Sequence, residues 1–400
     1  MNAPTKSPRV AGFRAHGVHA GLKPRALDVT VIAADEAIPV AGVFTTTQAP
    51  GAPVVWTRAR VAAGRARALV VNAGNANVAT GSRGRRDTEV MAGDVAKGLG
   101  CPPRQVLVAS TGVIGVPLPM ATLRRGIRGA VKGLTPAGLG RSARAIMTTD
   151  TVPKIATRRF ELAGRETTLC GIAKGSGMIE PGMATMLAFL MTDADASPSY
   201  LQGALRRAAD ESFNRVTVDG EMSTSDMTLL LASGRAGNPA LRSRRSASAE
   251  AFEDALGSLS QELARVIARD GEGATKLLIV DVSGAKTRAQ ATTAARRVAN
   301  SMLVKTAIYG CDPNWGRILQ TLGAGDVAIR PDRLTISVGS VCVYRRGVPA
   351  GKSQVLRASR SMKAEEVSLR IDLGTGRAEG RVYSCDLSHG YISINADYTT

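Results

Sequence analysis

The amino-acid sequence predicts an α/β protein made of layered helices and mixed sheets. The chain has 400 residues, which is long for one ordinary core, so two domains or one large layered domain is expected. Segments with strand periodicity and segments with helical periodicity follow one another irregularly. A hydrophobic content of 44% with 21% charged residues is ordinary for a globular chain. The irregular order favours mixed sheets over a doubly wound parallel sheet.

Short strands dominate the prediction for the first 75 residues, and helices become frequent after them. Alternating β-branched residues and buried apolar runs predict strands over 26–34, 37–47, 66–74 and 104–115, with a further short strand beginning at Pro53. Helical spacing predicts helices over 87–100, where a glycine ends the pattern, and over the Ala- and Arg-rich block 121–147.

The middle of the chain is predicted to alternate between strands and helices. A hairpin is expected over 158–178, with its turn near Ala163 and Gly164, followed by a buried strand over 184–194. The pattern then predicts a helix over 197–214, two strands around a polar loop over 215–234, and a helix over 246–270 with Ser248 as its N-cap.

The last part is predicted to be rich in strands. A loop feeds a strand that ends near Ala285, and a helix running into a strand is expected over 287–310. Further strands are predicted over 333–344, 366–374, 380–388 and 391–398.

Composition excludes several classes of protein. No run of about 18 apolar residues marks a transmembrane helix, and the N-terminus lacks the apolar segment of a signal peptide, so a cytoplasmic protein that binds no membrane is expected. The five cysteines are widely spaced without a C-x-x-C motif, and three histidines are scattered, so no metal site is predicted.

Charge and glycine-rich loops give no sign of nucleotides or nucleic acid. The net charge is +19, but the arginines are dispersed and aromatic residues make up only 4%, which argues against stacking on bases. The stretch "GVPAGKS" at Gly347–Ser353 ends like a phosphate-binding loop, yet it lacks the first glycine at the required spacing. We therefore expect no cofactor.

Thr185 stands out in "KGSGMIEPGMATMLAFLMTDA", a stretch of small and apolar residues from Lys174 to Ala194. An internal threonine is a weak nucleophile, but cleavage before it creates an α-amino group that acts as its base. The unperturbed pKa of such an amine is about 7.7–8.0, which suits a general base. Ala184 and the preceding turn "EPGM" allow close approach at this bond. From spacing alone, a packed strand residue remains the commoner interpretation.

Other polar positions fit acyl transfer to or from a small zwitterion. Thr111 and Gly112 end a predicted buried strand, where a hydroxyl and a backbone N–H stabilise an oxyanion. Lys174 suits a carboxylate and Glu272 an amine. Each feature alone is also ordinary turn or capping chemistry.

Together these stretches resemble the glutamate N-acetyltransferase family, also called the ornithine acetyltransferase family, over nearly the whole chain. The motifs are "STGVIG" (110–115), "MTTDTVPK" (147–154), "AKGSGMIEPGMATMLAF" (173–189), "DGEGATK" (270–276), "LVKTAIYGCDPNWGRI" (303–318) and the final "NADYTT". The resemblance implies an α/β/β/α sandwich with a smaller C-terminal lobe at about 280–380. It also implies self-cleavage into an α chain, 1–184, and a β chain, 185–400, assembled as a dimer of αβ units or larger.

The resemblance further implies a ping-pong reaction through acetyl-Thr185. Acetyl would pass from N2-acetylornithine to glutamate, and the residues do not decide whether acetyl-CoA also serves as donor. Thr111 and Gly112 match the oxyanion hole, and Ala184–Thr185 is the implied scissile bond. The implied substrate-binding residues are Thr148, Lys174, Thr185, Glu272, Asn395 and Thr400.

The sequence departs from the family pattern at a few positions. Val78 replaces a frequent Cys, Glu221 and Met222 replace Asp-Thr, Ser225 replaces Asn, and Met302 replaces a common Pro. Some divergent members belong to secondary-metabolite pathways, so a different acyl donor or acceptor is an alternative. An amidohydrolase or aminopeptidase with the same Thr nucleophile is another, and a non-enzymatic binding protein a third.

Overall fold

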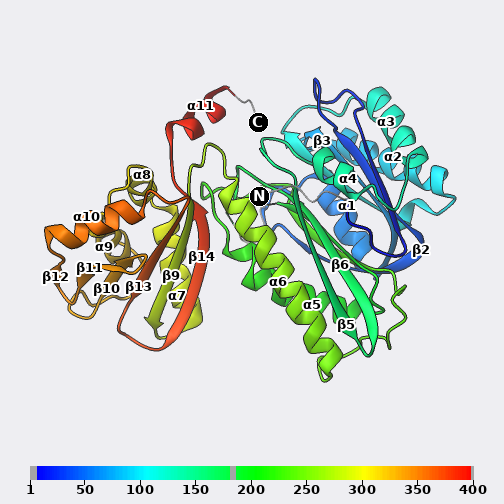
Figure 1. Cartoon of the computed structure of the whole chain (residues 1–400). Coiled ribbons are helices and arrows are strands. Elements are labelled where there is room, and N and C mark those ends of the chain that lie inside the picture. Colours follow the sequence, from blue (N-terminus) through cyan, green and yellow to red (C-terminus); the bar gives the residue numbers. More distant parts are fainter. Residues whose placement is uncertain (1–6, 181–185, 398–400) are drawn as a thin grey trace.

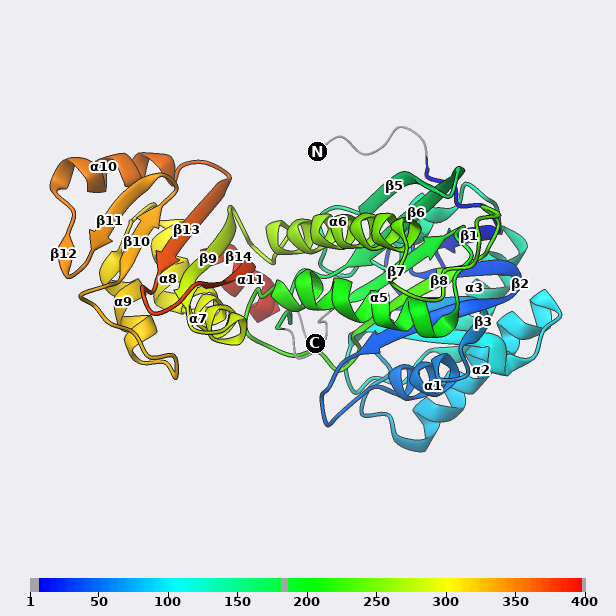
Figure 2. The same cartoon turned by 90° about the horizontal axis from the view of Figure 1, so that it is seen from below.

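The computed structural model of the chain describes residues 7–180 and 186–397 and has two lobes (Figure 1, Figure 2). The first lobe, on the right in Figure 1, contains an eight-stranded sheet, and the second, on the left, a six-stranded sheet. The chain crosses from the first lobe to the second between α6 (Ala247–Arg269) and β9 (Leu277–Ala285). After the second sheet it returns to the junction of the lobes as α11 (His389–Asp397).

The sheet of the first lobe has the strand order β4-β3-β2-β8-β7-β6-β5, with β1 paired to β2. Its strands are β1 (Phe13–Val18), β2 (Val29–Phe44), β3 (Arg65–Asn75), β4 (Val106–Val113), β5 (Lys154–Leu162), β6 (Arg165–Lys174), β7 (Leu187–Thr192) and β8 (Met227–Ala232). Parallel and antiparallel pairs both occur, since β3–β4 and β7–β8 are parallel and the other neighbours are antiparallel.

Strand β2 is the link between two halves of this sheet. Its first part pairs with β1 and β3, and its last part, from Val40, pairs with β8. The register shifts between Ala33 and Ile38, where the strand changes partners. The two strands predicted over 26–34 and 37–47 are therefore one long strand shared by two half-sheets.

The half-sheets face each other and form the two middle layers of a sandwich. One hydrophobic cluster joins the inner faces of β2–β4 to those of β6–β8, for example Leu69 and Leu107 with Phe189 and Leu229. A second cluster lies under helices α2 (Gly81–Leu99) and α3 (Met120–Lys132). A third lies under α5 (Pro198–Glu211) and α6. The predicted α/β/β/α sandwich is confirmed, and inner strands such as β7 and β8 are buried on both faces because helices cover the outer ones.

Two further helices, α1 (Ala52–Val61) and α4 (Leu139–Ala145), complete the first lobe with short 3-10 turns at Pro103–Gln105 and Phe213–Arg215. The hairpin β5–β6 turns through Ala163 and Gly164, both with positive φ, as the sequence predicts.

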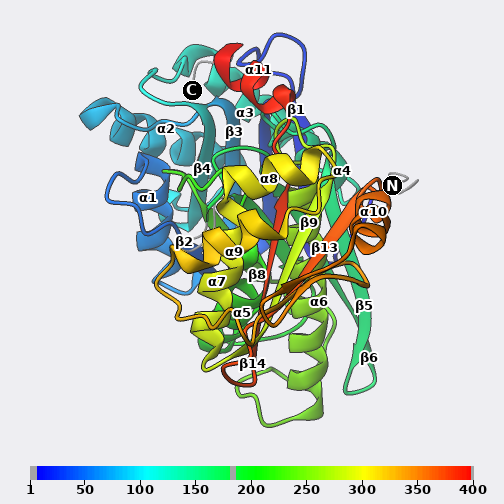
Figure 3. The same cartoon turned by 90° about the vertical axis from the view of Figure 1, so that its left-hand side faces the viewer.

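The second lobe has a mixed sheet of order β12-β11-β10-β13-β9-β14. Its strands after β9 are β10 (Thr335–Val338), β11 (Val341–Arg345), β12 (Val348–Pro349), β13 (Glu366–Asp372) and β14 (Ala378–Cys385). Its helices are α7 (Arg288–Asn300), α8 (Met302–Tyr309), α9 (Trp315–Gly323) and α10 (Lys352–Ser361). These four helices share one hydrophobic cluster with the sheet, and α7, α8 and α9 lie side by side in Figure 3.

Several local predictions were wrong. The segment after Pro53 is helix α1, because proline at the first helical turn favours a helix start. Residues 302–309 form helix α8, because the Ser301 side chain accepts from the Val304 N–H and starts a new helix after α7. Ser246, and not Ser248, caps α6 in the same way.

Three further segments also differ from their predictions. The predicted helical block 121–147 is two helices, α3 and α4. The first predicted strand of 215–234 is only an isolated bridge from Val216 to Tyr383. The predicted strand 391–398 is replaced over its described residues by α11, which follows a turn where Ser388 Oγ accepts from the Gly390 N–H. None of the helices in residues 7–180 and 186–397 is both long enough and apolar enough to cross a membrane.

Candidate active site

A cavity of about 220 Å³ lies where the two lobes meet. Six of the residues predicted from the sequence line it: Thr111, Gly112, Thr148, Lys174, Glu272 and Asn395. They come from five separate parts of the chain, which the fold brings to one place. Ala184, Thr185 and Thr400, the remaining predicted site residues, lie outside the described residues.

Thr111 and Gly112 stand at the end of β4, beside the parallel strand β3. Gly112 has φ +125°, and a Cβ there would lie 2.4 Å from the carbonyl carbon of Gly74. Only glycine fits this position, because both the φ angle and the space exclude a side chain. The chain therefore leaves the strand in a fixed direction and carries the Thr111 hydroxyl into the cavity wall.

Lys174 ends β6 and is buried, with its ammonium beside the predicted oxyanion residues. Its Nζ donates to Thr111 Oγ1 at 3.3 Å. Because the hydroxyl oxygen accepts this bond, its own proton is left to donate elsewhere. Burial lowers the pKa of Lys174, while the carboxylates of Asp150, Asp226 and Glu272 act in the opposite direction. The ionised Asp150 carboxylate favours the charged form of this lysine, whose side chain is nearly buried at the cavity wall.

Glu272 and Asn395 meet across the junction of the lobes. Asn395 Nδ2, from α11, donates to Glu272 Oε2 at 2.9 Å. A Cβ on Gly177 would lie 2.2 Å from the same Glu272 oxygen, so a side chain there would displace the carboxylate from its present position. The Glu272 N–H also donates to the Ser176 carbonyl at 2.9 Å. The backbone of Glu272 is thus tied to the segment that follows Lys174, and its carboxylate is oriented by Asn395.

A buried ionic network fixes the loops that carry these residues. Lys154 Nζ, on β5, donates to Asp150 Oδ1 at 2.6 Å and to Asp270 Oδ2 at 2.5 Å. Asp150 also accepts the N–H groups of Thr148, at 3.0 Å, and Gly175, at 2.8 Å. Burial alone raises the pKa of Asp150, but Lys154, Lys174 and these hydrogen bonds bring it down to about 2. The carboxylate is therefore ionised at neutral pH and organises three loops at once.

Asp219 and Tyr391 belong to the site but carry no recognisable signal in the sequence. The Asp219 carboxylate accepts the N–H groups of Met178, at 2.7 Å, and Ile179, at 2.8 Å. Tyr391 donates its hydroxyl to Asp219 at 3.4 Å, and burial raises the pKa of that hydroxyl. Asp219 thus supports the backbone on the way from Lys174 to the predicted nucleophile. In the sequence, Asp219 and Gly220 indicate only a turn.

Asp226 is a second residue that sequence patterns did not single out. It is 2% exposed, and its Oδ2 has no hydrogen-bond partner among the described residues. Burial raises the pKa of this carboxyl well above its ordinary value, against the opposing effects of Ser223 and Lys174. Asp226 immediately precedes Met227, whose N–H donates to the Met186 carbonyl at 3.0 Å. A buried acid with a shifted pKa beside a cavity is typical of functional sites.

Three of the departures from the family pattern lie in the cavity wall. Glu221, Met222 and Ser225 line it together with Thr111 and Gly112. Val78 does not line the cavity, since it is buried against Gly51 elsewhere in the first lobe. The loop 221–225 therefore forms part of the cavity wall beside the predicted oxyanion residues.

Comparisons with known proteins agree on one family. The model of the ArgJ family matches residues 14–400. A protein of Geobacter sulfurreducens is 46% identical over 392 residues, covering 98% of this chain and 100% of the relative. One of Symbiobacterium thermophilum is 47% identical over 393 residues, covering 98% and 97%. Both are named arginine biosynthesis bifunctional protein ArgJ.

A solved structure supports the same relationship. The crystal structure of the ArgJ protein of Bacillus halodurans is 41% identical to this chain, with a TM-score of 0.52. The match covers 54% of this chain and 100% of that one. With the family model spanning nearly the whole sequence, this chain belongs to the ArgJ family.

Proposed function

We propose that this chain is a glutamate N-acetyltransferase that moves acetyl from N2-acetylornithine to glutamate, giving ornithine and N-acetylglutamate. The observation that supports this most is the gathering of Thr111, Lys174, Glu272 and Asn395 around one cavity of about 220 Å³. This cavity offers Thr111 as an oxyanion donor, Lys174 as a cation for a substrate carboxylate, and Glu272 as a carboxylate for a substrate ammonium group. Few other reactions need all three beside a chain segment that leads to a threonine nucleophile.

The nucleophile in this proposal is Thr185, released as a new N-terminus. Its hydroxyl adds to the Ala184 carbonyl, the peptide C–N bond breaks, and water hydrolyses the resulting ester. The products are an α chain, 1–184, and a β chain, 185–400, whose free amine serves as base. Both residues of the scissile bond lie outside the described residues, so the proposal rests on sequence for this step.

Acetyl transfer then takes two balanced steps. The Thr185 oxygen attacks the acetyl carbonyl of N2-acetylornithine, its proton passes to the α-amine, and the C–N bond breaks as the leaving nitrogen is protonated. The glutamate amine next attacks the acetyl ester, the C–O bond breaks, and the threonine oxygen recovers a proton. In both steps the negative oxygen lies between the Thr111 hydroxyl and the Gly112 N–H.

The remaining site residues position the substrates. Lys174 pairs with a substrate carboxylate and also fixes the Thr111 hydroxyl as a donor. Glu272 pairs with a substrate ammonium and is itself oriented by Asn395. Thr148 and Thr400 add polar contacts, and Thr400 lies outside the described residues. A dimer of αβ units, or a larger assembly, in the cytoplasm remains the expected form.

A second candidate is a related acyltransferase or amidohydrolase with an altered acceptor. Glu221, Met222 and Ser225 in the cavity wall favour it, because they change the surface that the acceptor meets. Added glutamate separates the two candidates. It should accelerate ornithine release if glutamate is the acceptor and leave the rate unchanged if water is.

Mass spectrometry of the protein incubated with N2-acetylornithine tests the main proposal. Two fragments are expected, with an acetyl adduct on the one that begins at Thr185. The Thr185→Ala variant should give one full-length chain and no transfer. Two fragments from that variant would exclude self-cleavage by this residue.

A further inference from the structure

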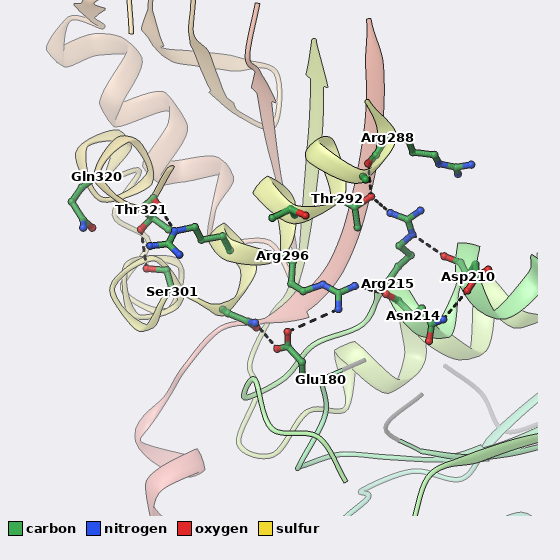
Figure 4. Close-up of a pocket in the computed structure, with 14 residues that line it drawn as sticks. Glu180, Asp210, Asn214, Arg215, Arg288, Thr292, Arg296, Ser301, Gln320 and Thr321 are labelled. Carbon is green, nitrogen blue, oxygen red and sulfur yellow. Dashed lines mark hydrogen bonds and ion pairs between the residues drawn. The ribbon is translucent and has the colours of Figure 1, made fainter. Parts of the chain in front are cut away.

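A second and larger cavity, of about 950 Å³, is a cleft between the lobes (Figure 4). One side comes from the first lobe, with Glu180, Asp210 and Arg215. The other side comes from helices α7 and α9 and the segment between α7 and α8. None of its lining residues lines the 220 Å³ cavity. Its size is in the range of pockets that hold small organic ligands.

The cleft carries an excess of positive charge. Its described lining includes the four arginines Arg215, Arg288, Arg296 and Arg297, but only two carboxylates, Glu180 and Asp210. Glu180 is already engaged, since it accepts from Asn300 and lies 3.9 Å from Arg296. Glu211, which is outside the lining, pairs with Arg288 and lies 3.8 Å from Arg215, so four arginines face three carboxylates. The cleft keeps an excess of positive charge, which attracts anions.

Two of the arginines are held in place by oxygens of the backbone. Arg297 donates from Nε to the Thr321 carbonyl at 2.7 Å and forms no ion pair with a carboxylate of the described chain. Arg215 donates from Nε to the Asp210 carbonyl at 2.8 Å, and its other end contacts Thr292 Oγ1 (Figure 4). Fixed guanidinium groups lose little conformational freedom when an anion binds.

The arginines also oppose one another. Burial lowers the pKa of Arg215, Glu211 acts against this effect, and Arg288 lowers the pKa further. Arg296 follows the same pattern, with burial first, Glu180 opposing and Arg215 adding to the decrease. An anion with several charges would relieve this repulsion.

The other donors of the cleft suit phosphate oxygens. Hydroxyl groups of Thr293 and Ser301 line it beside the arginines, while those of Thr292 and Thr321 also line it but already donate to the Arg288 carbonyl and to Ser301 Oγ. Guanidinium forks with hydroxyl donors are the usual partners of phosphate, because they match its geometry and charge. We propose that this cleft binds an organic ligand that carries phosphate groups.

The cleft and the candidate active site are close along the chain. Gly177 and Met178 line the smaller cavity, and Glu180 lines the cleft. A phosphorylated thioester donor would place its charged end in the cleft and its acyl group toward the smaller cavity. A free phosphorylated effector would need the cleft alone. Of these two ligands, only the thioester donor rests on the proposed acetyltransferase function.

Calorimetric titration with adenosine 3′,5′-bisphosphate tests the proposal on the full chain. We expect saturable binding that weakens on the order of tenfold or more in the Arg215→Gln/Arg288→Gln double variant. The Arg288→Gln single variant should show a smaller loss, and its side chain is 63% exposed, which keeps the fold intact. Arg265→Gln is the matched control, because it removes an exposed ion pair, to Glu366, outside the cleft.

The outcomes separate the cleft from the candidate active site. Absence of binding to the unaltered protein at millimolar bisphosphate, or equal binding by the double variant, would overturn the proposal. The double variant should transfer acetyl from N2-acetylornithine to glutamate at the unaltered rate. If the unaltered protein itself does not catalyse this transfer, the proposed function is wrong, but the phosphate-binding cleft is not affected. A raised KM for acetyl-CoA in the double variant identifies a thioester donor, whereas weaker bisphosphate binding with unchanged acetyl-CoA kinetics identifies a free effector.

Discussion

At the scale of single residues, the Thr111 hydroxyl is the group whose role is most sharply defined by its contacts. It accepts from Lys174 Nζ at 3.3 Å and so offers its own proton to the cavity. We expect Thr111→Ala to lower the rate of acetyl transfer by a factor on the order of 10²–10³, the usual loss for one oxyanion donor. Steady-state kinetics with Thr111→Ser as control, which keeps the hydroxyl, checks this. An equal loss in both variants would point to packing and not to the hydroxyl.

The buried Asp226 carboxyl should make the free energy of unfolding depend on pH. Its folded-state pKa is raised by burial, whereas an unfolded Asp titrates near 3.9. Between these two values the unfolded chain loses a proton that the folded chain keeps, so stability from this group is full at low pH and falls as pH rises through the folded pKa. The slope for one group is at most about 1.4 kcal/mol per pH unit.

We therefore expect Asp226→Asn to become more stable relative to the unaltered protein as pH rises from about 4 toward the raised pKa. Urea unfolding at several pH values measures the difference. A constant difference across that range would mean that Asp226 does not hold its proton in the folded state. A difference that changes the opposite way would mean that its pKa is lowered.

At the scale of elements, β5 is tied to the site loops by the buried Lys154. Removing its charge, as in Lys154→Met, leaves Asp150 and Asp270 buried without their cation. We expect a loss of about 3–5 kcal/mol in the free energy of unfolding, as for other broken buried ion pairs. Arg124→Met is the control, because Arg124 forms an exposed ion pair with Asp94, and water screens such pairs so that they contribute little to stability. Equal losses in denaturant titrations of the two variants would contradict the assigned role.

The sequence is most informative about elements whose pattern is decided locally. The apolar runs of β7 and β8 and the hairpin of β5 and β6 were predicted because burial on both faces or a tight turn leaves a clear pattern. Helix α11 was missed because its residues alternate like a strand, and its structure depends on a turn at Ser388 and on the contact of Asn395 with Glu272.

The site shows the same limit for single residues. Motifs locate Thr111, Lys174 and Glu272, but Asp219 and Asp226 act through backbone contacts and burial that no local pattern marks. The arginine cleft was also missed, since its arginines come from both lobes and look dispersed along the chain.

At the scale of the whole molecule, the proposed scissile bond lies inside one continuous sheet. Strands β7 and β8, which follow Thr185, lie between β2 and β6, which precede it. Strand β7 is hydrogen-bonded to β6 along Leu169–Lys174, and β8 to β2 along Val40–Phe44. The hydrophobic cluster under α5 and α6 also joins residues from both sides of the bond.

Cleavage at Ala184–Thr185 should therefore leave one folded body. Separating the chains would break the β2–β8 and β6–β7 pairings, expose four strand edges and uncover much of that cluster. This cost outweighs the translational and rotational freedom that two separate chains would gain. We expect both fragments to elute in a single peak in gel filtration and to unfold in one cooperative thermal transition. Denaturing electrophoresis of the same peak shows whether it contains both chains. Elution of either fragment alone under native conditions would mean that the sheet does not hold the two chains together.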